Sequence, residues 1–243
     1  MIKQTLRNGL LRLGVYVSRA SSIPFGVDAY ADIAALEPSV AVAFDVGANR
    51  GQTVARMRAH LPNVRIFSFE PVASTFTILK NNVNRDRGVE CLQMALGDLK
   101  GQAEIAISKV SDRNTLSALA GPDHTTEVIS VTTVDDFVAE RNLERIDILK
   151  MDTEGYESAV LRGAAKSFEA NRIGFVLAEC EFTPNPAEPH GDFFEILKFL
   201  SPFGYRVVAF YSGGVDANGW RWGDVLFARP CAGRPVTCSP FTR

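Results

Sequence analysis

Short, almost continuous apolar runs recur along the chain and are separated by stretches in which apolar residues follow helical spacing. Such runs are typical of parallel strands that helices cover on both faces. The pattern predicts strands over residues 42–44, 64–71, 146–151, 175–182, 205–212 and 224–230, and a further strand followed by a turn within residues 89–98. The last two strands are joined by GGVDANGWRWG, a turn-rich connection. It predicts helices over residues 30–36, 76–84, 134–142 and 192–204, and one that ends near residue 60. This alternation indicates an α/β protein with a doubly wound sheet.

Residues 101–134 interrupt this alternation. Two stretches in which apolar and polar residues alternate, AEIAIS and EVISVTTV, flank the polar loop SDRNTLSALAGPDHTTE. An alternation of period two is the pattern of a strand with one buried face. We therefore expect an antiparallel β insertion here, which would cover or shape a substrate pocket.

The N-terminal segment has a helical pattern of its own. Apolar residues recur at helical spacing over residues 2–19 among basic residues, with no acidic residue before Asp28. A basic amphipathic helix of this kind packs across its own domain or another subunit, or contacts a membrane surface. Because Arg12 interrupts the apolar run GLLRLGVYV, we expect neither a cleaved signal nor a membrane span.

The expected organisation is a helical extension over residues 1–39, a main domain over 40–230 and a tail over 231–243. The main domain, of about 190 residues, is long enough to bury a substantial core.

The charge balance argues against one class of partner. With 26 basic and 28 acidic residues the net charge is −2 and the sequence pI is about 6.0. No overall positive field would therefore attract a nucleic-acid backbone. The four cysteines form neither a C-x-x-C pair nor a metal-type cluster with histidine. Cys91 and Cys180 are expected in the core, whereas Cys231 and Cys238 lie in the Pro-rich tail, where a disulfide would need an oxidising compartment. We expect a cytoplasmic protein, with residues 2–19 as its potential membrane contact.

The first chemically informative stretch is VAFDVGANRGQT, residues 42–53. An apolar strand that contains Asp45 leads into a turn with Gly47, Asn49 and Gly51, after which helix-forming residues begin. Glycine permits a sharp turn and a close approach of the backbone to a ligand. The order D-x-G-x-N-x-G differs from the dinucleotide fingerprint G-x-G-x-x-G. An acid at the strand end suits a ligand with an amine and a positive centre, such as S-adenosylmethionine, although another nucleotide or a turn without ligand remains open.

Two further acids follow the next two strands. Glu70 ends the second strand, where it would lie beside the glycine turn and accept both ribose hydroxyls, and Pro71 shapes the turn after it. Asp98 follows the third strand, where it could reach an adenine amino group or simply form a turn.

The second informative stretch is IDILKMDTEGYE, residues 146–157. It places Asp152, Glu154 and Glu157 at a strand end, and carboxylates are costly to gather unless they face a cation, a metal or a substrate hydroxyl. Alternatively, Asp152 or Thr153 caps the next helix, with the glutamates in its first turn.

The motifs FDVGANRGQT, FEP, ALGD and LKMDTEGYE occur in this order, before a glycine-ended helix and a final pair of strands. This combination resembles the FkbM family of S-adenosylmethionine-dependent methyltransferases over about residues 40–229. The D-x-E-G-x-E element is characteristic of that family rather than of methyltransferases in general. The resemblance implies the Rossmann-like, seven-stranded class I methyltransferase sheet, parallel except for its reversed last strand, with helices on both faces.

The same resemblance implies O-methylation, often of a sugar hydroxyl on a glycolipid, an oligosaccharide or a natural product. It puts Glu70 at the ribose, Asp98 by the adenine, and Asp152 and Glu154 on the family's acidic motif. The donor turn would consist of Asp45, Gly47, Asn49 and Gly51.

For the reaction itself we expect an in-line methyl transfer to a hydroxyl, which needs alignment and removal of a proton. Asp152 is the first candidate for contact with the reacting hydroxyl, as base or as ligand of a divalent ion. Glu154 would support it, and Glu179 near the end of the next strand is a candidate third oxygen donor. His190, on a loop at the same end of the sheet, is the alternative base.

Two other function classes remain open at this point. An NAD-dependent oxidoreductase would use a similar sheet, but the altered glycine spacing disfavours it. A non-catalytic binding protein would keep the fold and attach to a membrane or a partner enzyme through its basic N-terminal helix. In that case Asp152→Ala would change nothing, whereas removal of residues 1–20 would abolish partner binding.

Overall fold

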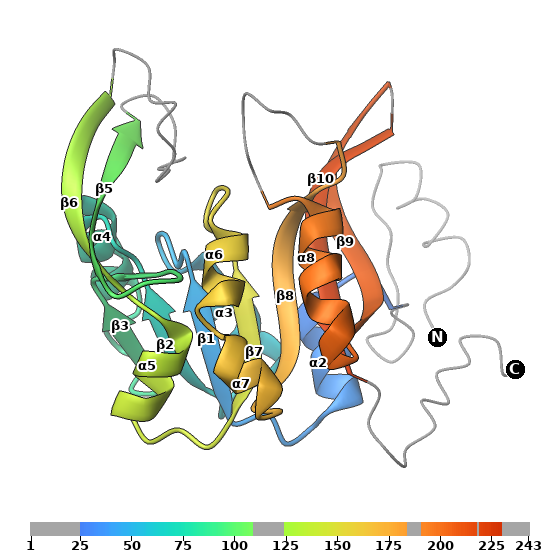
Figure 1. The fold of residues 1–243 in the computed structure, drawn as a ribbon. Coiled ribbons are helices and arrows are strands. Elements are labelled where there is room, and N and C mark those ends of the chain that lie inside the picture. The colour runs from blue at the N-terminus through green and yellow to red at the C-terminus, as the bar shows by residue number, and fades with distance from the viewer. Residues whose placement is uncertain (1–24, 109–123, 184–190, 218, 230–243) are drawn as a thin grey trace, which may run out of the picture.

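The structure is a computed structural model, and it describes residues 25–108, 124–183, 191–217 and 219–229 (Figure 1). The expectations for residues 2–19, for His190 and for Cys231 and Cys238 lie outside the described residues.

A seven-stranded sheet forms the centre of the molecule, in the strand order β3-β2-β1-β7-β8-β10-β9 (Figure 1). Its strands are β1 (Val42–Val46), β2 (Arg65–Phe69), β3 (Val89–Leu92), β7 (Ile146–Met151), β8 (Ile173–Glu181), β9 (Arg206–Asp216) and β10 (Gly219–Ala228). β1 pairs in parallel with both β2 and β7, whereas β10 runs antiparallel to β8 and to β9. The expected Rossmann-like sheet with a reversed last strand is confirmed.

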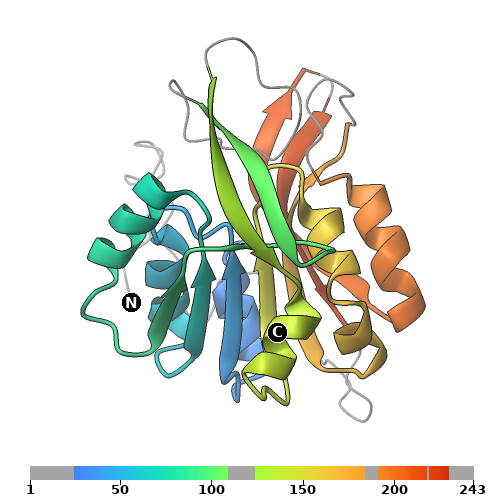
Figure 2. The ribbon, with the colours of Figure 1, turned by 60° about the vertical axis from the view of Figure 1, so that its left-hand side comes forward.

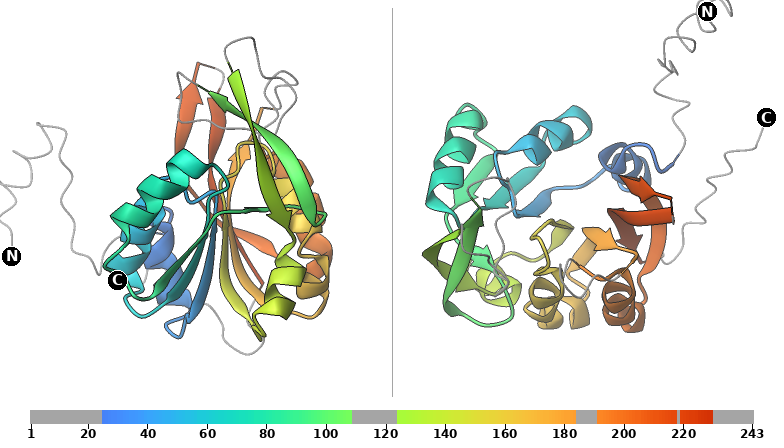
Figure 3. Two further views of the ribbon diagram at one scale, coloured as in Figure 1. Left: turned by 90° about the vertical axis from the view of Figure 1, so that its left-hand side faces the viewer. Right: turned by 90° about the horizontal axis from the view of Figure 1, so that it is seen from above.

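Helices cover both faces of this sheet, as the view from above shows (Figure 3). The helices are α2 (Ala29–Leu36), α3 (Gln52–His60), α4 (Ala73–Asn82), α5 (Val134–Glu140), α6 (Glu157–Arg162), α7 (Ala165–Glu169) and α8 (Phe193–Leu200), followed by the 3-10 turn Ser201–Phe203. Side-chain caps begin several of them: Asp28 accepts from the backbone of α2, Thr133 from α5 and Asp192 from α8. Gly204 ends the last helical segment in the left-handed conformation, with φ 82°.

Two apolar layers hold the helices to the sheet. On one face a cluster of rings, Phe44, Phe67, Phe69 and Phe137, makes edge contacts at centroid distances of 5.0–5.5 Å. On the other face α2 and α3 pack on the sheet through buried residues such as Tyr30, Ile33, Val54 and Met57. Burial of this apolar surface on both faces is the main stabilising contribution to such a fold.

A second, three-stranded sheet stands beside the first, in the order β4-β6-β5. β4 (Ala95–Leu96) pairs in parallel with β6 (His124–Thr132), and β6 pairs antiparallel with β5 (Gly101–Ser108). The hairpin of β5 and β6 projects past the C-terminal edge of the main sheet, as does the hairpin of β9 and β10 (Figures 1 and 2). The hairpin of β5 and β6 occupies the segment where the sequence predicts a β insertion.

Two predicted boundaries were wrong. Residues 89–98 do not form one strand, because β3 ends at Leu92 and β4 belongs to the second sheet. The stretch GGVDANGWRWG, predicted as a turn-rich connection, is mostly strand: β9 continues to Asp216 and β10 begins at Gly219. Turn propensities misled here, since Gly213 and Gly223 are needed for close packing rather than for a turn. A Cβ on Gly213 would lie 1.9 Å from the carbonyl oxygen of Trp222, and one on Gly223 3.1 Å from the indole of Trp220.

None of the helices in the described part of the chain is long and apolar enough to cross a membrane.

Candidate active site

The turn after β1 lies against the end of β7. Gly47 has φ 75°, and a Cβ at this position would lie 1.8 Å from the carbonyl oxygen of Asp152. The backbone N–H of Asp152 in turn donates to the carbonyl of Val46. Only glycine fits such an approach at a positive φ. The predicted glycine turn therefore brings the two acidic motifs of the sequence, residues 45–51 and 152–157, into direct contact.

Glu70 lies beside this turn, as predicted for the end of the second strand. One of its carboxylate oxygens accepts the backbone N–H of Asn49 at 3.0 Å and the other that of Val72 at 3.1 Å. Asn49 takes a left-handed conformation, φ 47°, which asparagine tolerates better than most residues. Burial raises the pKa of Glu70 to about 7, against the effect of the two N–H donors.

A buried lysine joins the donor turn to the acidic loop. Lys150 Nζ lies 3.3 Å from Asp45 Oδ1 and 3.3 Å from Asp152 Oδ2, and it donates to the carbonyl of Gly47 at 3.4 Å. Burial disfavours its charge, but the carboxylates of Asp152 and Asp45 outweigh this and raise the pKa of Lys150. Burial raises the pKa of Asp45, and Lys150 opposes that rise. The lysine is therefore the counter-ion that these two acids require.

Asp45 is thus placed differently from the sequence-based expectation. It is fully buried within β1 and does not line the cavity described below. Its carboxylate faces Lys150, so its predicted contact with a bound donor stays a prediction.

The loop from Asp152 to Tyr156 carries the second motif. Glu154 has φ 53° and Gly155 φ 103°, so two consecutive residues are left-handed. For a glutamate this conformation is uncommon, and such strain gathers at functional sites. Glu157, the first residue of α6, is buried and accepts both the backbone N–H and the hydroxyl of Thr153. It therefore holds the loop in place, while α6 has no side-chain cap from Asp152 or Thr153.

Acidic side chains from the loop after β7, from β8 and from β10 lie beside one another. Ligand atoms of Asp152, Glu154 and Glu179 lie within 4.8 Å of one another. Asp224 on β10 is the cross-strand partner of Glu179. Burial, followed by the charge of Asp152, raises the pKa of Glu179 to about 8. Burial also raises the pKa of Asp224. We call Asp152, Glu179 and Asp224 the acid row.

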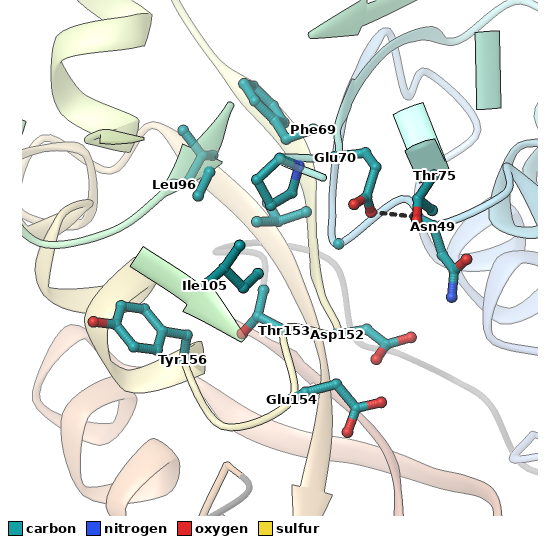
Figure 4. Close-up of a pocket in the computed structure, with 14 residues that line it drawn as sticks. Asn49, Phe69, Glu70, Thr75, Leu96, Ile105, Asp152, Thr153, Glu154 and Tyr156 are labelled. Atoms are coloured by element: carbon teal, nitrogen blue, oxygen red, sulfur yellow. Dashed lines mark hydrogen bonds between the residues drawn. The ribbon is translucent and has the colours of Figure 1, made fainter. Parts of the chain in front are cut away.

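A cavity opens between the donor turn, the acidic loop and the second sheet (Figure 4). Its lining residues are Val46, Gly47, Asn49, Phe69, Glu70, Pro71, Thr75, Ala95, Leu96, Ile105, Asp152, Thr153, Glu154 and Tyr156. Figure 4 shows the apolar side chains of Leu96 and Ile105 on one side, with the carboxylates of Asp152 and Glu154 pointing away from them. The cavity therefore has an apolar wall suited to a flat ring and a polar wall suited to hydroxyl or amino groups.

Most of the predicted site residues meet at this place. Gly47, Asn49, Glu70, Pro71, Asp152 and Glu154 all line the cavity. Gly51 does not line the cavity and instead forms the N-cap of α3, with φ 88°. Asp98 does not reach the cavity lining, because its carboxylate accepts from Arg162 at 3.1 Å on the surface. The turn-forming alternative for Asp98 thus agrees better with the geometry, and its contact with adenine has no support there.

Sequence reasoning missed Lys150, Tyr156 and Asp224. Lys150 had a signal in the sequence, since a lysine within the apolar run IDILKM requires a buried partner. Tyr156 and Asp224 had none, because only the fold brings β10 and the residue before α6 to this edge.

Comparisons with known proteins agree with this geometry. A family model described as the methyltransferase FkbM domain matches residues 45–207. The 31-O-demethyl-FK506 methyltransferase FkbM of Streptomyces tacrolimicus is 28% identical over 198 residues, which are 69% of this chain and 74% of that one. The hexuronic acid methyltransferase AglP of Haloferax volcanii is 29% identical over 148 residues, 60% of this chain and 59% of that one. Across its curated relatives the chain spans between 56% and 74% of their length.

Among solved structures, the METTL16 methyltransferase domain matches the fold with a TM-score of 0.50 and 12% sequence identity, and the match covers 92% of this chain and 77% of that one. This likeness concerns the fold alone. The family match covers residues 45–207, which include the glycine turn and the acidic loop but not Asp224. The chain belongs to the FkbM methyltransferase domain family.

Proposed function

We propose that this protein transfers a methyl group from S-adenosylmethionine to a hydroxyl, with a sugar hydroxyl as the favoured acceptor. The observation that carries the proposal is the junction of Gly47 with Asp152, which sets a donor-type turn directly against an acidic loop. The name of one relative indicates O-methylation by that protein, and the name of another indicates a hexuronic acid acceptor for that protein.

The donor half of the proposal rests on the turn and on Glu70. Each carboxylate oxygen of Glu70 already accepts one backbone N–H and keeps a further lone pair for a ribose hydroxyl. The apolar wall with Leu96 and Ile105 suits an adenine ring. These features fit a nucleoside ligand, and Gly47 and Asn49 of the turn line the same cavity beside the strand ends.

In the acceptor half, the residues must position the hydroxyl and take its proton. S-adenosylmethionine supplies the methyl group: a carbon–oxygen bond forms as the carbon–sulfur bond breaks. Asp152 is held by Lys150 as an ion pair and is our candidate for the proton acceptor. Glu179, with a pKa of about 8, is mostly protonated at neutral pH and would donate a hydrogen bond to the acceptor.

The same acids raise the question of a divalent ion. Three carboxylates within 4.8 Å are the hard oxygen donors that Mg²⁺ and Ca²⁺ use. One oxygen of Asp152 is already paired with Lys150, and exposed acids often gather without an ion. Metal dependence is therefore tested separately: methyl transfer is measured after chelation and again after Mg²⁺ or Ca²⁺ is added back.

The direct test is calorimetric titration of the protein with S-adenosylmethionine, S-adenosylhomocysteine and NADH, repeated on Glu70→Ala. We expect both methyl-cycle compounds to bind and the affinity to fall by at least tenfold in the variant. Binding of NADH alone would favour an oxidoreductase. No binding to any of the three by folded protein would favour the non-catalytic alternative.

Transfer itself is tested with donor labelled in the methyl group and a panel of neutral and acidic glycans. Asp152→Asn is expected to reduce kcat by about 10²- to 10⁴-fold, since a positioned base contributes that range, with donor affinity nearly unchanged. Glu140→Gln, an acid-to-amide change at an exposed residue that pairs with Lys100 and does not line the cavity, serves as the matched control for handling and folding.

A further inference from the structure

The hairpin of β9 and β10 holds an exposed indole in line with the acid row. Trp222 is 39% exposed, and in register it is opposite Glu181, while Asp224 is opposite Glu179. Because the register between β8 and β10 is regular here, Trp222 and Asp224 point to the same face of the sheet, about 7 Å apart along the strand. The indole thus extends the surface that begins at the acid row.

The indole ring of Trp222 packs with one face against the backbone of β9 at Gly214. A Cβ on Gly214 would lie 2.3 Å from Nε1 of Trp222 and 2.9–3.0 Å from two of its ring carbons. One face of the ring therefore covers the backbone at Gly214, and the exposed part is available to a ligand. A side chain at position 214 would therefore meet the indole, so this position requires glycine.

The neighbouring indole faces the other way. Trp220 contacts the ring of Phe182 at a centroid distance of 6.0 Å, and it lies over Gly223, whose cross-strand partner is Cys180. Gly223 and Asp224 are adjacent on β10 and so point to opposite faces of the sheet. Only Trp222 stands on the face of the acid row, which makes Trp220 an internal control.

An indole face beside carboxyl groups has the chemistry that recognises a sugar ring. The apolar C–H face of a pyranose packs on an aromatic face, while its hydroxyls donate to carboxylate oxygens. An anionic sugar would meet the carboxylates of Asp152, Glu154 and Asp224, and Lys150 is already shared by Asp45 and Asp152. The charge of the site therefore disfavours uronic acids and sugar phosphates.

We propose that Trp222 and the acid row form the acceptor subsite for an uncharged pyranose ring. The inference rests on the proposed function, since it names the acceptor class of the same site. It distinguishes this chain from its relative named as a hexuronic acid methyltransferase.

Fluorescence tests the subsite without any methyl transfer. The chain has two tryptophans, and both lie in this hairpin. Trp220→Phe leaves Trp222 as the sole indole, and Trp222→Phe leaves Trp220.

Each variant, saturated with S-adenosylhomocysteine, is titrated with cellobiose, maltose, chitobiose and methyl β-D-glucuronide. We expect a saturable change with at least one neutral disaccharide in Trp220→Phe, a response at least fivefold smaller in Trp222→Phe, and none with the glucuronide.

Three outcomes of the sugar titrations would overturn the subsite: equal responses in the two variants, no response to any neutral sugar, or glucuronide binding as strong as neutral-sugar binding. A Trp222 signal that shifts with phosphatidylcholine vesicles and not with sugars would likewise overturn it and assign the hairpin to a lipid surface. Calorimetry with S-adenosylhomocysteine verifies that each variant remains folded.

Kinetics separates this inference from the proposed function. Once a methylated glycan is found, Trp222→Ala and Gly214→Ala should each raise its KM about tenfold with the donor KM unchanged, because one removes the platform and the other displaces it. Transfer with unaltered acceptor KM in both variants refutes the subsite and leaves the proposed function intact. Sugar binding without donor binding refutes the proposed function and leaves the subsite.

Discussion

Lys150 Nζ lies 3.3 Å from Oδ1 of Asp45, and the two side chains are 8% and 0% exposed. The strands that carry them, β7 and β1, are neighbours in the sheet, with Asp45 and Lys150 in direct register. The ion pair therefore sits under the junction between the donor turn and the acidic loop. The pair therefore links β1 to β7 next to the ends of both strands.

Removing one member of this pair should be strongly destabilising. Lys150→Met leaves Asp45 as an uncompensated buried charge, and we expect the free energy of unfolding to fall by about 3–5 kcal/mol. Urea denaturation followed by circular dichroism measures this. The double variant Asp45→Asn/Lys150→Met should recover at least half of the loss. A single variant that costs less than about 1 kcal/mol would show that the pair contributes little.

Gly47 should not tolerate even alanine. The new Cβ would lie 1.8 Å from the carbonyl oxygen of Asp152, at φ 75°. We expect a loss of about 3 kcal/mol or more in the free energy of unfolding, and loss of donor binding with it. Gly101→Ala is the matched control, since nothing lies within 4 Å of its added Cβ. Similar thermal denaturation of the two variants would contradict the predicted close approach.

Donor affinity should depend on pH through Glu70. With a pKa of about 7, its carboxyl group changes from mostly protonated at pH 6 to mostly ionised at pH 8. Only the ionised form accepts two ribose hydroxyls, so the affinity for S-adenosylhomocysteine should rise about tenfold over this interval. Calorimetry at several pH values measures it. Glu70→Gln should bind weakly and without this pH dependence, and a pH-dependent affinity in that variant would assign the titration to another group.

Glu179 should make the folded state less stable as the pH rises. Its pKa is about 8 in the fold against an ordinary value of 4.5, so between these values the folded state holds a proton that the unfolded chain has released. The contribution of this group to stability is therefore present below about pH 4.5 and is lost as the pH rises through 8. Urea denaturation from pH 5 to 9 should show a shallower decline for Glu179→Gln than for the natural chain, and identical slopes would contradict the prediction.

The sequence was sufficient for much of the donor side. Gly47, Asn49 and Glu70 line the cavity as their order along the chain predicts, because in a parallel sheet the turns after neighbouring strands meet at one edge. Asp152 and Glu154 were found for the same reason. Local chemistry and the handedness of the fold together fix these positions, so no long-range contact had to be guessed.

Only the tertiary structure determined the partners of the charges. The sequence predicts Asp45 as a ligand-binding acid. In the structure Lys150, 105 residues later, lies in register with Asp45 and forms an ion pair with its carboxylate. Asp98 reads as a group that could reach adenine, but Arg162 on α6 pairs with it at the surface. The direction of a side chain depends on which strand or helix lies beside it, and sequence spacing does not encode that neighbour.

The acceptor side shows the same division. The sequence places both tryptophans in the glycine-rich stretch GGVDANGWRWG, and turn propensity predicted a connection there rather than strands. Pairing of β10 with both β8 and β9 turned it into an extended hairpin and brought Trp222 and Asp224 to the face of Asp152 and Glu179. Cross-strand register sets which side chains share a face, and that register is fixed by the packing of the whole sheet.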